Sequence, residues 1–308
     1  MAVAREAGLP SPAVLRPWLR LQEALAAYVF LAPAALIFAA FIIFPVLFSF
    51  YLSLTRWNLL EPRKAFVGLE NYLTLLRDPV FSRALLNTLY FAAGSIPLSM
   101  VLALAVALLL NQKVRGMAAY RVAYFSPMVT STVAIAVVWM WIFDPYNGVA
   151  NYALSLVGVP PLRWLFDPGW AMPALIIMRV WQTLGYNVVV YLAGLQNVPE
   201  TYYEAARIDG ASPWSLFRSI TLPLLSPSTF FILVMSIISS FQVFAQIHVM
   251  TQGGPLQSTT VIVYYIYQHA FEGYRMGYSS AMAFVLFAVI FSLTLVQMKW
   301  VQRRVHYE

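Results

Sequence analysis

Six apolar runs, each long enough to cross a lipid bilayer, constrain the fold of this chain more than any other feature. A helix needs about 20 residues to span roughly 30 Å of hydrocarbon, and backbone groups in lipid must bond within the spanning element. The runs cover residues 27–54, 84–110, 122–143, 170–195, 224–250 and 279–300. The sequence therefore predicts an all-α, polytopic transmembrane helical bundle with six spans over residues 27–308, preceded by an arm over residues 1–26.

Composition agrees with a membrane protein and excludes several kinds of site. Of the 308 residues, 61% are hydrophobic and 10% are charged, whereas soluble domains have about 25% charged residues. The chain has no cysteine, which excludes disulfides, thiolate metal sites and cysteine nucleophiles, and its three histidines are too scattered for a metal site. We expect no metal and no cofactor in this chain. The first apolar run is about twice as long as the 7–15 residues of a signal-peptide core, so it should persist as a helix.

The basic residues predict the orientation. The net charge is +7, but nearly all of the 19 lysines and arginines lie beside the apolar runs, where they meet lipid headgroups rather than nucleic acid. An even number of spans, six, places both termini on the same side of the membrane. Eleven of the lysines and arginines lie on that side. Seven lie on the other side, and five of those seven are in the loop after the first run. Because cytoplasmic loops carry the basic excess, both termini and the loop at about 196–223 are predicted to be cytoplasmic.

Two loops on the opposite side have turn-forming sequences. Residues 143–170 combine Pro, Gly, Asn and aromatic residues, which predicts a folded cap with a short interfacial helix. The segment "TQGGPLQST" at 251–259 predicts a tight turn where the chain leaves the fifth run.

A polar segment, "ETYYEAARIDGASPWSLFRSITLP" at 200–223, separates the fourth and fifth runs. Pro199 and Glu200 predict a helix start, since proline fits the first turn and an acid favours the positive end of the dipole. Gly210 can take the left-handed conformation that ends such a helix. Ser212 is positioned to cap a second helix with Pro213 in its first turn. The segment should form a helix-turn-helix hairpin.

The first helix of this hairpin has the composition of a docking surface. Ala205 and Ala206 have small side chains, so a partner can approach this part of the helix closely. The acids Glu204 and Asp209 lie on either side of them in the sequence. The alternative is an amphipathic loop lying on the headgroups. Such helices carry several basic residues, whereas this one has only Arg207 against three acids.

The hairpin residues also carry a resemblance to a known family. Glu204-Ala205-Ala206, Gly210, Ile220 and Leu222-Pro223 are spaced as in the EAA loop of permease subunits of bacterial binding-protein-dependent ABC importers. The strings "FVGLENYLTLL", "YFSPMVTSTVAIAVVWMWIFDP" and "MTQGGPLQSTT" extend the resemblance over nearly the whole chain, to the carbohydrate-uptake branch and the first permease subunit of maltose and glycerol-3-phosphate systems. The resemblance implies a type I ABC importer permease fold whose EAA helix couples to an ATP-binding subunit. The implied coupling residues are Glu204, Ala205, Ala206, Asp209, Gly210, Ile220, Leu222 and Pro223.

The resemblance also implies partners and a location. They are a second permease, two copies of an ATP-binding subunit that would hold ATP and Mg, and an extracytoplasmic substrate-binding protein, at the inner membrane of a prokaryote. The sequence agrees that this chain is a transport subunit and not the ATPase, because none of its lysines, Lys64, Lys113 and Lys299, follows a glycine as a phosphate loop requires. The "TQGGP" turn is either a plain turn or, by resemblance, a surface for the binding protein.

Polar residues within the runs are candidates for a substrate path. In the fifth run Ser239, Gln242 and Gln246 would share one helical face, with Ser236 and Ser240 beside them. In the fourth run a similar stripe should lie next to a gap left by Gly185, and its residues are Arg179, Gln182, Thr183 and Tyr186. Hydroxyls, amides and nearby aromatic rings suit a neutral sugar. The alternative is that these residues bond neighbouring helices to one another. Resemblance to maltose-type permeases favours substrate contact for Gln182, Gly185, Tyr186, Ser236 and Ser240.

Arg179 is the one charged residue deep within a run. A charge there costs about 2.5–3.5 kcal/mol on insertion scales. It would meet an anionic substrate such as a glycerophosphate, snorkel to the interface, or pair with a partner subunit.

Three other classes of function are less consistent with the sequence. A stand-alone secondary transporter should have coupling acids within the membrane, but all twelve Asp and Glu fall in loops or at their edges. An intramembrane hydrolase would rest on "GYSSA" at 277–281, which lacks the G-x-S-x-G elbow. A scaffold protein would not account for the EAA spacing.

Overall fold

The computed structural model describes residues 17–112 and 116–301, in two compact units, Met1–Leu52 and Ser53–Glu308. The first unit is helical: α1 (Pro17–Phe38) continues through a π-helical turn (Ala39–Ile43) into α2 (Phe44–Ser53). Residues 22–53 form one candidate membrane span. Of the arm expected over residues 1–26, residues 1–16 lie outside the described part and residues 17–26 already belong to α1.

The second unit begins outside the bundle. A two-stranded antiparallel ribbon pairs β1 (Thr55–Arg56) with β2 (Ala65–Phe66), and α3 (Glu70–Leu76) follows. The remaining elements are α4 (Pro79–Leu110), α5 (Met117–Val129), α6 (Thr132–Ile142), α7 (Val149–Ser155), a 3-10 turn (Trp164–Phe166), α8 (Ala171–Gln196), α9 (Glu200–Ile208), α10 (Pro213–Leu216), a π turn (Phe217–Thr221), α11 (Leu222–Leu224), α12 (Ser226–Phe241), α13 (Ala245–Met250), α14 (Ile262–Tyr267), a π turn (Gln268–Glu272) and α15 (Met276–Val301). The all-α prediction is confirmed.

Four helices of the described chain are each long and apolar enough to cross a membrane, and two bent helix pairs raise the number to six. The six-span prediction is confirmed on this reading, but not every span is one straight helix. The third run breaks between α5 and α6, with an angle of 113°. Thr130 is extended there, and its Oγ1 donates to the carbonyl of Ser126 at 3.0 Å, so the side chain competes with the helical bonding pattern.

The fifth run was expected to be continuous over residues 224–250, and this is wrong. A bend of 61° separates 213–224 from α12, and α12 itself ends at Phe241, before α13 begins at Ala245. Buried Phe241 packs with α4, α14 and α15, whereas buried Val243 packs with α6 and α8. Tertiary packing here overrides the local preference for a continuous helix.

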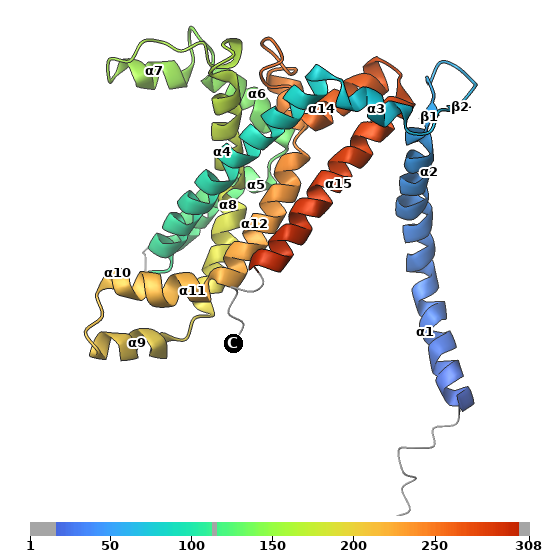
Figure 1. Cartoon of the computed structure of the whole chain (residues 1–308). Helices are drawn as coiled ribbons and strands as arrows, with labels where there is room; N and C mark the ends of the chain where they lie inside the picture. Colours follow the sequence, from blue (N-terminus) through green and yellow to red (C-terminus); the bar gives the residue numbers. More distant parts are fainter. Residues whose placement is uncertain (1–16, 113–115, 302–308) are drawn as a thin grey trace, which may run out of the picture. The chain divides into compact units, whose positions relative to one another are not determined.

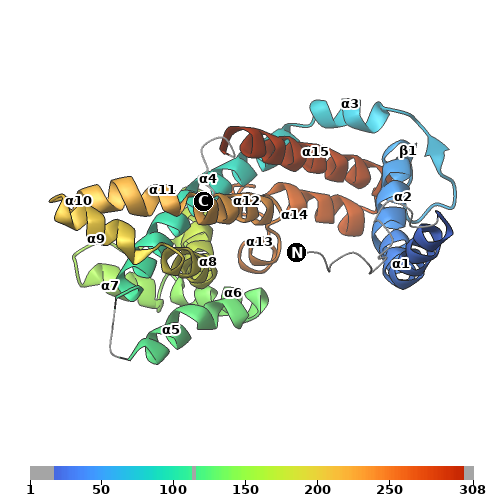
Figure 2. The ribbon, with the colours of Figure 1, turned by 90° about the horizontal axis from the view of Figure 1, so that it is seen from below.

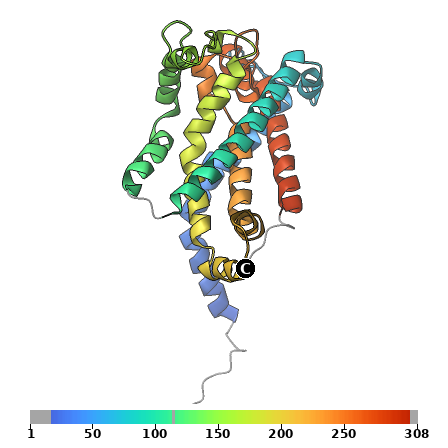
Figure 3. The same ribbon diagram turned by 90° about the vertical axis from the view of Figure 1, so that its left-hand side faces the viewer.

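The second unit is built around α4 and α8, which pack along each other (Figures 1 and 3). Ala103 and Ala107 of α4 are fully buried against Val188 and Tyr191 of α8. Small side chains at these positions allow two helices to approach closely. Asn187 of α8 also donates to Ser99 Oγ of α4, at 3.4 Å.

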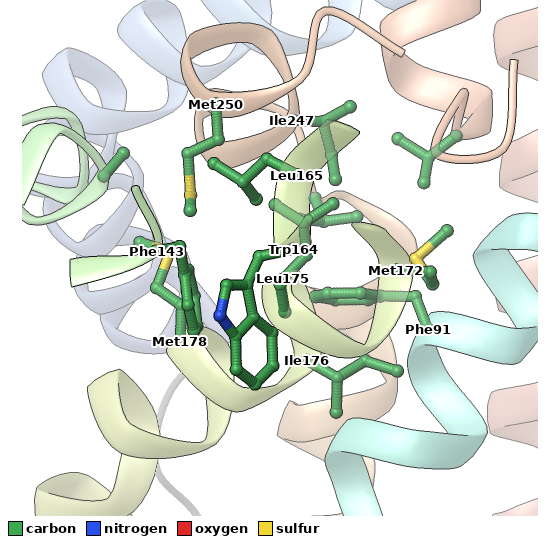
Figure 4. Close-up of a cluster of buried hydrophobic side chains, with 14 of the residues drawn as sticks. Phe91, Phe143, Trp164, Leu165, Met172, Leu175, Ile176, Met178, Ile247 and Met250 are labelled. Carbon is green, nitrogen blue, oxygen red and sulfur yellow. The ribbon is translucent and has the colours of Figure 1, made fainter. Parts of the chain in front are cut away.

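The predicted cap over residues 143–170 is confirmed as a folded segment containing α7, and it is organised around Asn151. The Asn151 Oδ1 accepts from the Trp164 indole at 2.9 Å and from the backbone amide of Leu162 at 3.0 Å. Its Nδ2 donates to the carbonyls of Pro145 and Leu162. Trp164 then enters the core beside Phe143, with ring centroids 4.9 Å apart (Figure 4). The buried Asn151 amide thus holds the cap together, and Trp164 packs the cap against the core.

The tight turn predicted after the fifth run is also present. Gly253 has a φ of +78°, and a Cβ there would lie 2.6 Å from Thr260 Oγ1. Thr260 Oγ1 donates to the Gly253 carbonyl at 3.1 Å. The turn therefore needs glycine for both its conformation and its space.

Candidate functional site

The polar segment between α8 and α12 forms the expected hairpin, with α9 as one arm and α10–α11 as the other (Figures 1 and 2). It lies at the end of the bundle opposite α7 and α14 (Figure 1). The predicted start at Pro199-Glu200 is confirmed, because Pro199 is the N-cap of α9 and Glu200 its first residue.

The turn of the hairpin is a Schellman motif. Gly210 has a φ of +79°. The amide of Ala211 donates to the carbonyl of Ala206 at 2.9 Å, and that of Gly210 donates to Arg207 at 3.0 Å, which is the bond pair that defines this C-cap. Ser212 then caps α10 by accepting from the amide of Ser215 at 3.3 Å. The predictions for Gly210, Ser212 and Pro213 are confirmed.

The two arms are joined by side chains on their inner faces. Tyr203 Oη lies 3.0 Å from Thr221 Oγ1. Glu200, Tyr203 and Arg207, which are spaced i, i+3 and i+7 and so share one face of α9, line a cavity of about 490 Å³ together with Asn111, Gln196 and Thr221. This face of α9 therefore points toward the ends of α4 and α8.

The outer face of α9 carries most of the motif. Glu204 and Ala205 are exposed, as is Asp209, which is the C-cap. Ala206 is half-buried, and on the other arm Ile220 and Pro223 are half-buried while Leu222 is exposed. The hairpin thus exposes two acids and a small residue.

The predicted polar stripe on α8 is present but is largely used in helix packing. Gln182 is buried, and its Nε2 donates to Thr132 Oγ1 of α6 at 2.9 Å. Thr183 Oγ1 donates to the carbonyl of Arg179 in its own helix at 2.9 Å. Tyr186 is half-buried.

The gap expected beside Gly185 is filled, and that prediction is wrong. A Cβ on Gly185 would lie 2.0 Å from the carbonyl oxygen of Tyr124, because the backbone of α5 crosses α8 at this glycine. Gly185 is a helix-contact residue in the structure.

The shared face of Ser239, Gln242 and Gln246 is likewise wrong, since the helix ends between them. Ser236 and Ser239 are half-buried on α12, and the Ser239 hydroxyl donates to the carbonyl of Ser236 at 3.1 Å. Ser240 is buried and Gln242 is exposed at the break. Gln246 is 1% exposed, and neither atom of its amide has a hydrogen-bond partner among the described residues.

Arg179 is half-buried on α8, between buried Met178 and Val180. The Arg179 guanidinium forms no ion pair within the described residues, so it is not neutralised by this part of the chain.

An unexpected polar cluster joins three helices at the opposite end of the bundle from the hairpin. Asp78 caps α4 through the amides of Val80 and Phe81, and its Oδ2 accepts from Tyr265 and Tyr278, each at 2.7 Å. Burial raises the pKa of the Asp78 carboxyl, but these hydrogen bonds outweigh it and hold the pKa below its ordinary value. Burial lowers the pKa of the adjacent His269 imidazole. Only the Asp-Pro pair at 78–79, a helix-start signal, pointed to this cluster in the sequence.

A bundle with bent spans and a polar helical hairpin at one end is consistent with a membrane transport subunit. Comparison with known proteins gives the family: residues 78–307 match the model of the binding-protein-dependent transport system inner membrane component. The chain belongs to this family and is a permease subunit of an ABC importer.

Individual relatives agree along most of the chain. The trehalose/maltose transport system permease protein MalF of Thermococcus litoralis is 37% identical, over 91% of this chain and 95% of the relative. The sn-glycerol-3-phosphate transport system permease protein UgpA of Yersinia pestis is 32% identical, also over 91% and 95%. A crystal structure of a bacterial ABC transporter involved in import of the acidic polysaccharide alginate has a chain with a TM-score of 0.81 and 25% identity, over 93% of this chain and 98% of that one. The ABC importer permease fold is therefore confirmed.

Proposed function

We propose that this chain forms half of the translocation path for a sugar or sugar-like solute and couples it to ATP hydrolysis through the hairpin of α9–α11. The hairpin carries the proposal, because two acids and a small residue on it are exposed, while Tyr203 and Arg207 line a cavity with the ends of α4 and α8. A partner that moves α9 would therefore move α4 and α8.

The partners follow from this role. A second permease completes the path, two copies of an ATP-binding subunit hold ATP and Mg and dock on the coupling residues, and an extracytoplasmic binding protein delivers the solute. When ATP closes the ATPase pair, the hairpins are drawn together and the bundle shifts between two states. The free energy of ATP binding then drives transport because the contacts between the hairpins and the ATPase pair differ between those two states. Both termini and the hairpin face the cytoplasm, and the "TQGGP" turn faces the binding protein.

The proposed sugar contacts surround the break between α12 and α13. Gln242 is exposed there, and the buried Gln246 amide lacks protein partners among the described residues. Unpaired buried amides are costly, and sugar hydroxyls would satisfy them. Phe244 and Tyr267 add ring faces, with centroids 5.0 Å apart. The other proposed path residues are Gln182, Tyr186, Ser236, Ser239 and Ser240, whereas Gly185 is left out because the backbone of α5 fills the space beside it.

Arg179 favours a second candidate, an anionic solute such as a glycerol phosphate or an acidic saccharide. A half-buried guanidinium without a counter-charge in the described chain is a site for an oxyanion. Among the relatives, MalF is named for the neutral sugars trehalose and maltose. UgpA is named for the anionic solute sn-glycerol-3-phosphate.

Transport by the reconstituted complex tests the proposal. Glu204→Lys should leave the chain inserted, because Glu204 is exposed, but should weaken ATPase docking and transport through charge reversal. Unchanged transport would remove Glu204 from the coupling surface. To separate the two solute classes, Arg179→Gln should abolish uptake of an anionic solute and spare that of a neutral sugar.

A further inference from the structure

The helix α3 exposes a row of leucines at the end of the bundle opposite the hairpin (Figure 1). Leu69, Leu73 and Leu76 are spaced i, i+4 and i+7, so they share one face, and their exposed fractions run from 58% to 80%. The opposite face of α3 belongs to the core, where buried Leu75 clusters with Tyr278 of α15. An aliphatic row of this length is unfavourable in water.

The chain holds α3 at the boundary of the membrane. α3 ends at Leu76, and the span formed by α4 begins at Pro79. α3 also packs against α15, a second span, whose first residue is Met276. Figure 2 shows α3 on the outer side of α15, away from α12. Because two spans begin beside α3, its leucines lie at the depth where hydrocarbon meets headgroups.

A polar cavity of about 630 Å³ adjoins the leucine row. Leu73 lines it together with Arg77 and Arg275, and each arginine lies within two positions of the start of a span. Both arginines are exposed and form no ion pair in the part of the chain that the structure describes. The Arg275 guanidinium lies over the ring of Tyr278, with Cζ 4.7 Å from the ring centroid. Two cations at headgroup depth thus border one cavity.

The acids that line this cavity are engaged by other groups. Glu70 is paired with Arg56. Asp78 accepts hydrogen bonds from two backbone amides and from two tyrosine hydroxyls. His269 also lines the cavity, and burial lowers the pKa of its imidazole, so it is neutral at pH 7. Two guanidiniums therefore face one carboxylate that is outside an ion pair, and the cavity has an excess of positive charge.

We propose that this cavity and the leucine row bind an anionic phospholipid, with its phosphodiester on Arg77 and Arg275 and an acyl chain along the leucines. Guanidinium groups bind phosphate oxygens through paired N–H donors, and basic pockets beside spans hold lipid headgroups. The site also gives a role to basic residues of the first loop, which holds five of the seven on its side of the membrane. It does not depend on the coupling role of the hairpin.

Lipid binding by the purified complex tests the site. Phosphatidylglycerol would be titrated into the detergent-solubilised complex, and bound lipid would be counted by native mass spectrometry. The double variant Arg77→Gln/Arg275→Gln should raise the Kd for this lipid about 10- to 30-fold, the loss expected for two basic residues at a headgroup. Binding of phosphatidylcholine, which has no net charge, should be weaker and the same in parent and variant.

The matched control is Arg163→Gln, which removes the same charge from an exposed arginine of the cap, outside the cavity. It should bind phosphatidylglycerol as tightly as the parent. The site would be overturned if the double variant kept the parental Kd, or if Arg163→Gln weakened binding as much as the double variant, because the effect would then be one of overall charge. All three arginines are exposed, so their replacement should leave the fold intact.

The depth of the leucine row gives an independent readout, because the chain has no cysteine of its own. A nitroxide would be attached to Leu73→Cys in a complex whose other subunits lack reactive cysteines, in phosphatidylglycerol bilayers. It should collide with dissolved oxygen more often than with a water-soluble nickel chelate. Glu61→Cys, at an exposed acid of the same loop, is the control and should show the reverse. Preference for the nickel chelate at position 73 would overturn the site, as would shielding that appears only when a soluble binding protein is added.

Discussion

The hydroxyl of Tyr203 lies 3.0 Å from that of Thr221, and this bond joins the two arms of the coupling hairpin. Tyr203 belongs to α9 and Thr221 precedes α11, which leads into α12. The bond therefore makes the hairpin a braced unit, so that a displacement of α9 is passed to a membrane span.

Removing this brace should loosen coupling more than assembly. Tyr203→Phe keeps the ring but loses a hydrogen bond worth about 1 kcal/mol. We expect normal co-purification of the partners and more ATP hydrolysed per solute transported. Thr221→Val should have the same effect, and the double variant should be no worse than either single one. Additive losses would show that the two hydroxyls act separately.

The turn at Gly210 depends on its left-handed backbone. Gly210→Val should destabilise the hairpin by about 1–3 kcal/mol, the cost of holding a β-branched residue at a φ of +79°. Gly210→Asn is the control, since asparagine tolerates this conformation. Amide hydrogen exchange of α9 should rise in the valine variant only, and equal exchange in both would show that the turn does not limit hairpin stability.

The crossing of α5 and α8 depends on Gly185. Gly185→Ala would place a Cβ 2.0 Å from the Tyr124 carbonyl oxygen, so α5 must shift. We expect a loss of thermal stability worth about 1–3 kcal/mol, as for other overpacked contacts. Ala193→Ser, at an exposed position of the same helix, should be neutral. An unchanged unfolding temperature for Gly185→Ala would mean that the two helices separate easily.

The Asp78 cluster predicts a dependence of stability on acid pH. The pKa of Asp78 is lowered in the folded chain, so the unfolded chain takes up the proton first. The stabilisation is therefore complete above the unfolded pKa of about 3.9 and is lost as pH falls through the lower folded value. The Asp78→Asn variant should be less stable than the parent at neutral pH, and its stability should no longer carry the acid-dependent contribution of Asp78. Thermal unfolding of the solubilised complex at several pH values would measure both effects. An identical acid profile in the variant would contradict the assignment.

The features that could be predicted from the sequence are local ones. Gly210, Ser212 and Pro213 determine their own backbone through left-handed geometry, capping and a fixed φ, so the hairpin was predictable almost to the residue. The apolar runs likewise predicted the spans, because length and hydropathy alone decide membrane crossing.

The errors in the predicted path came from contacts between distant segments. Gly185 meets Tyr124, 61 positions earlier in the chain, and nothing beside the glycine indicates that neighbour. The break after Phe241 follows from the packing of Phe241 and Val243 into different core clusters, although the local sequence favours continuous helix. Helical spacing was therefore the wrong basis for grouping Gln242 with Gln246.

The composition of the complex tests the central claim most directly. The tagged chain would be extracted gently from native membranes, and the mass and stoichiometry of what co-purifies would be determined. We predict one copy of this chain, one different permease and two copies of an ATP-binding subunit. A chain that is recovered alone or as a homodimer, and that still moves solute without ATP, would contradict the account.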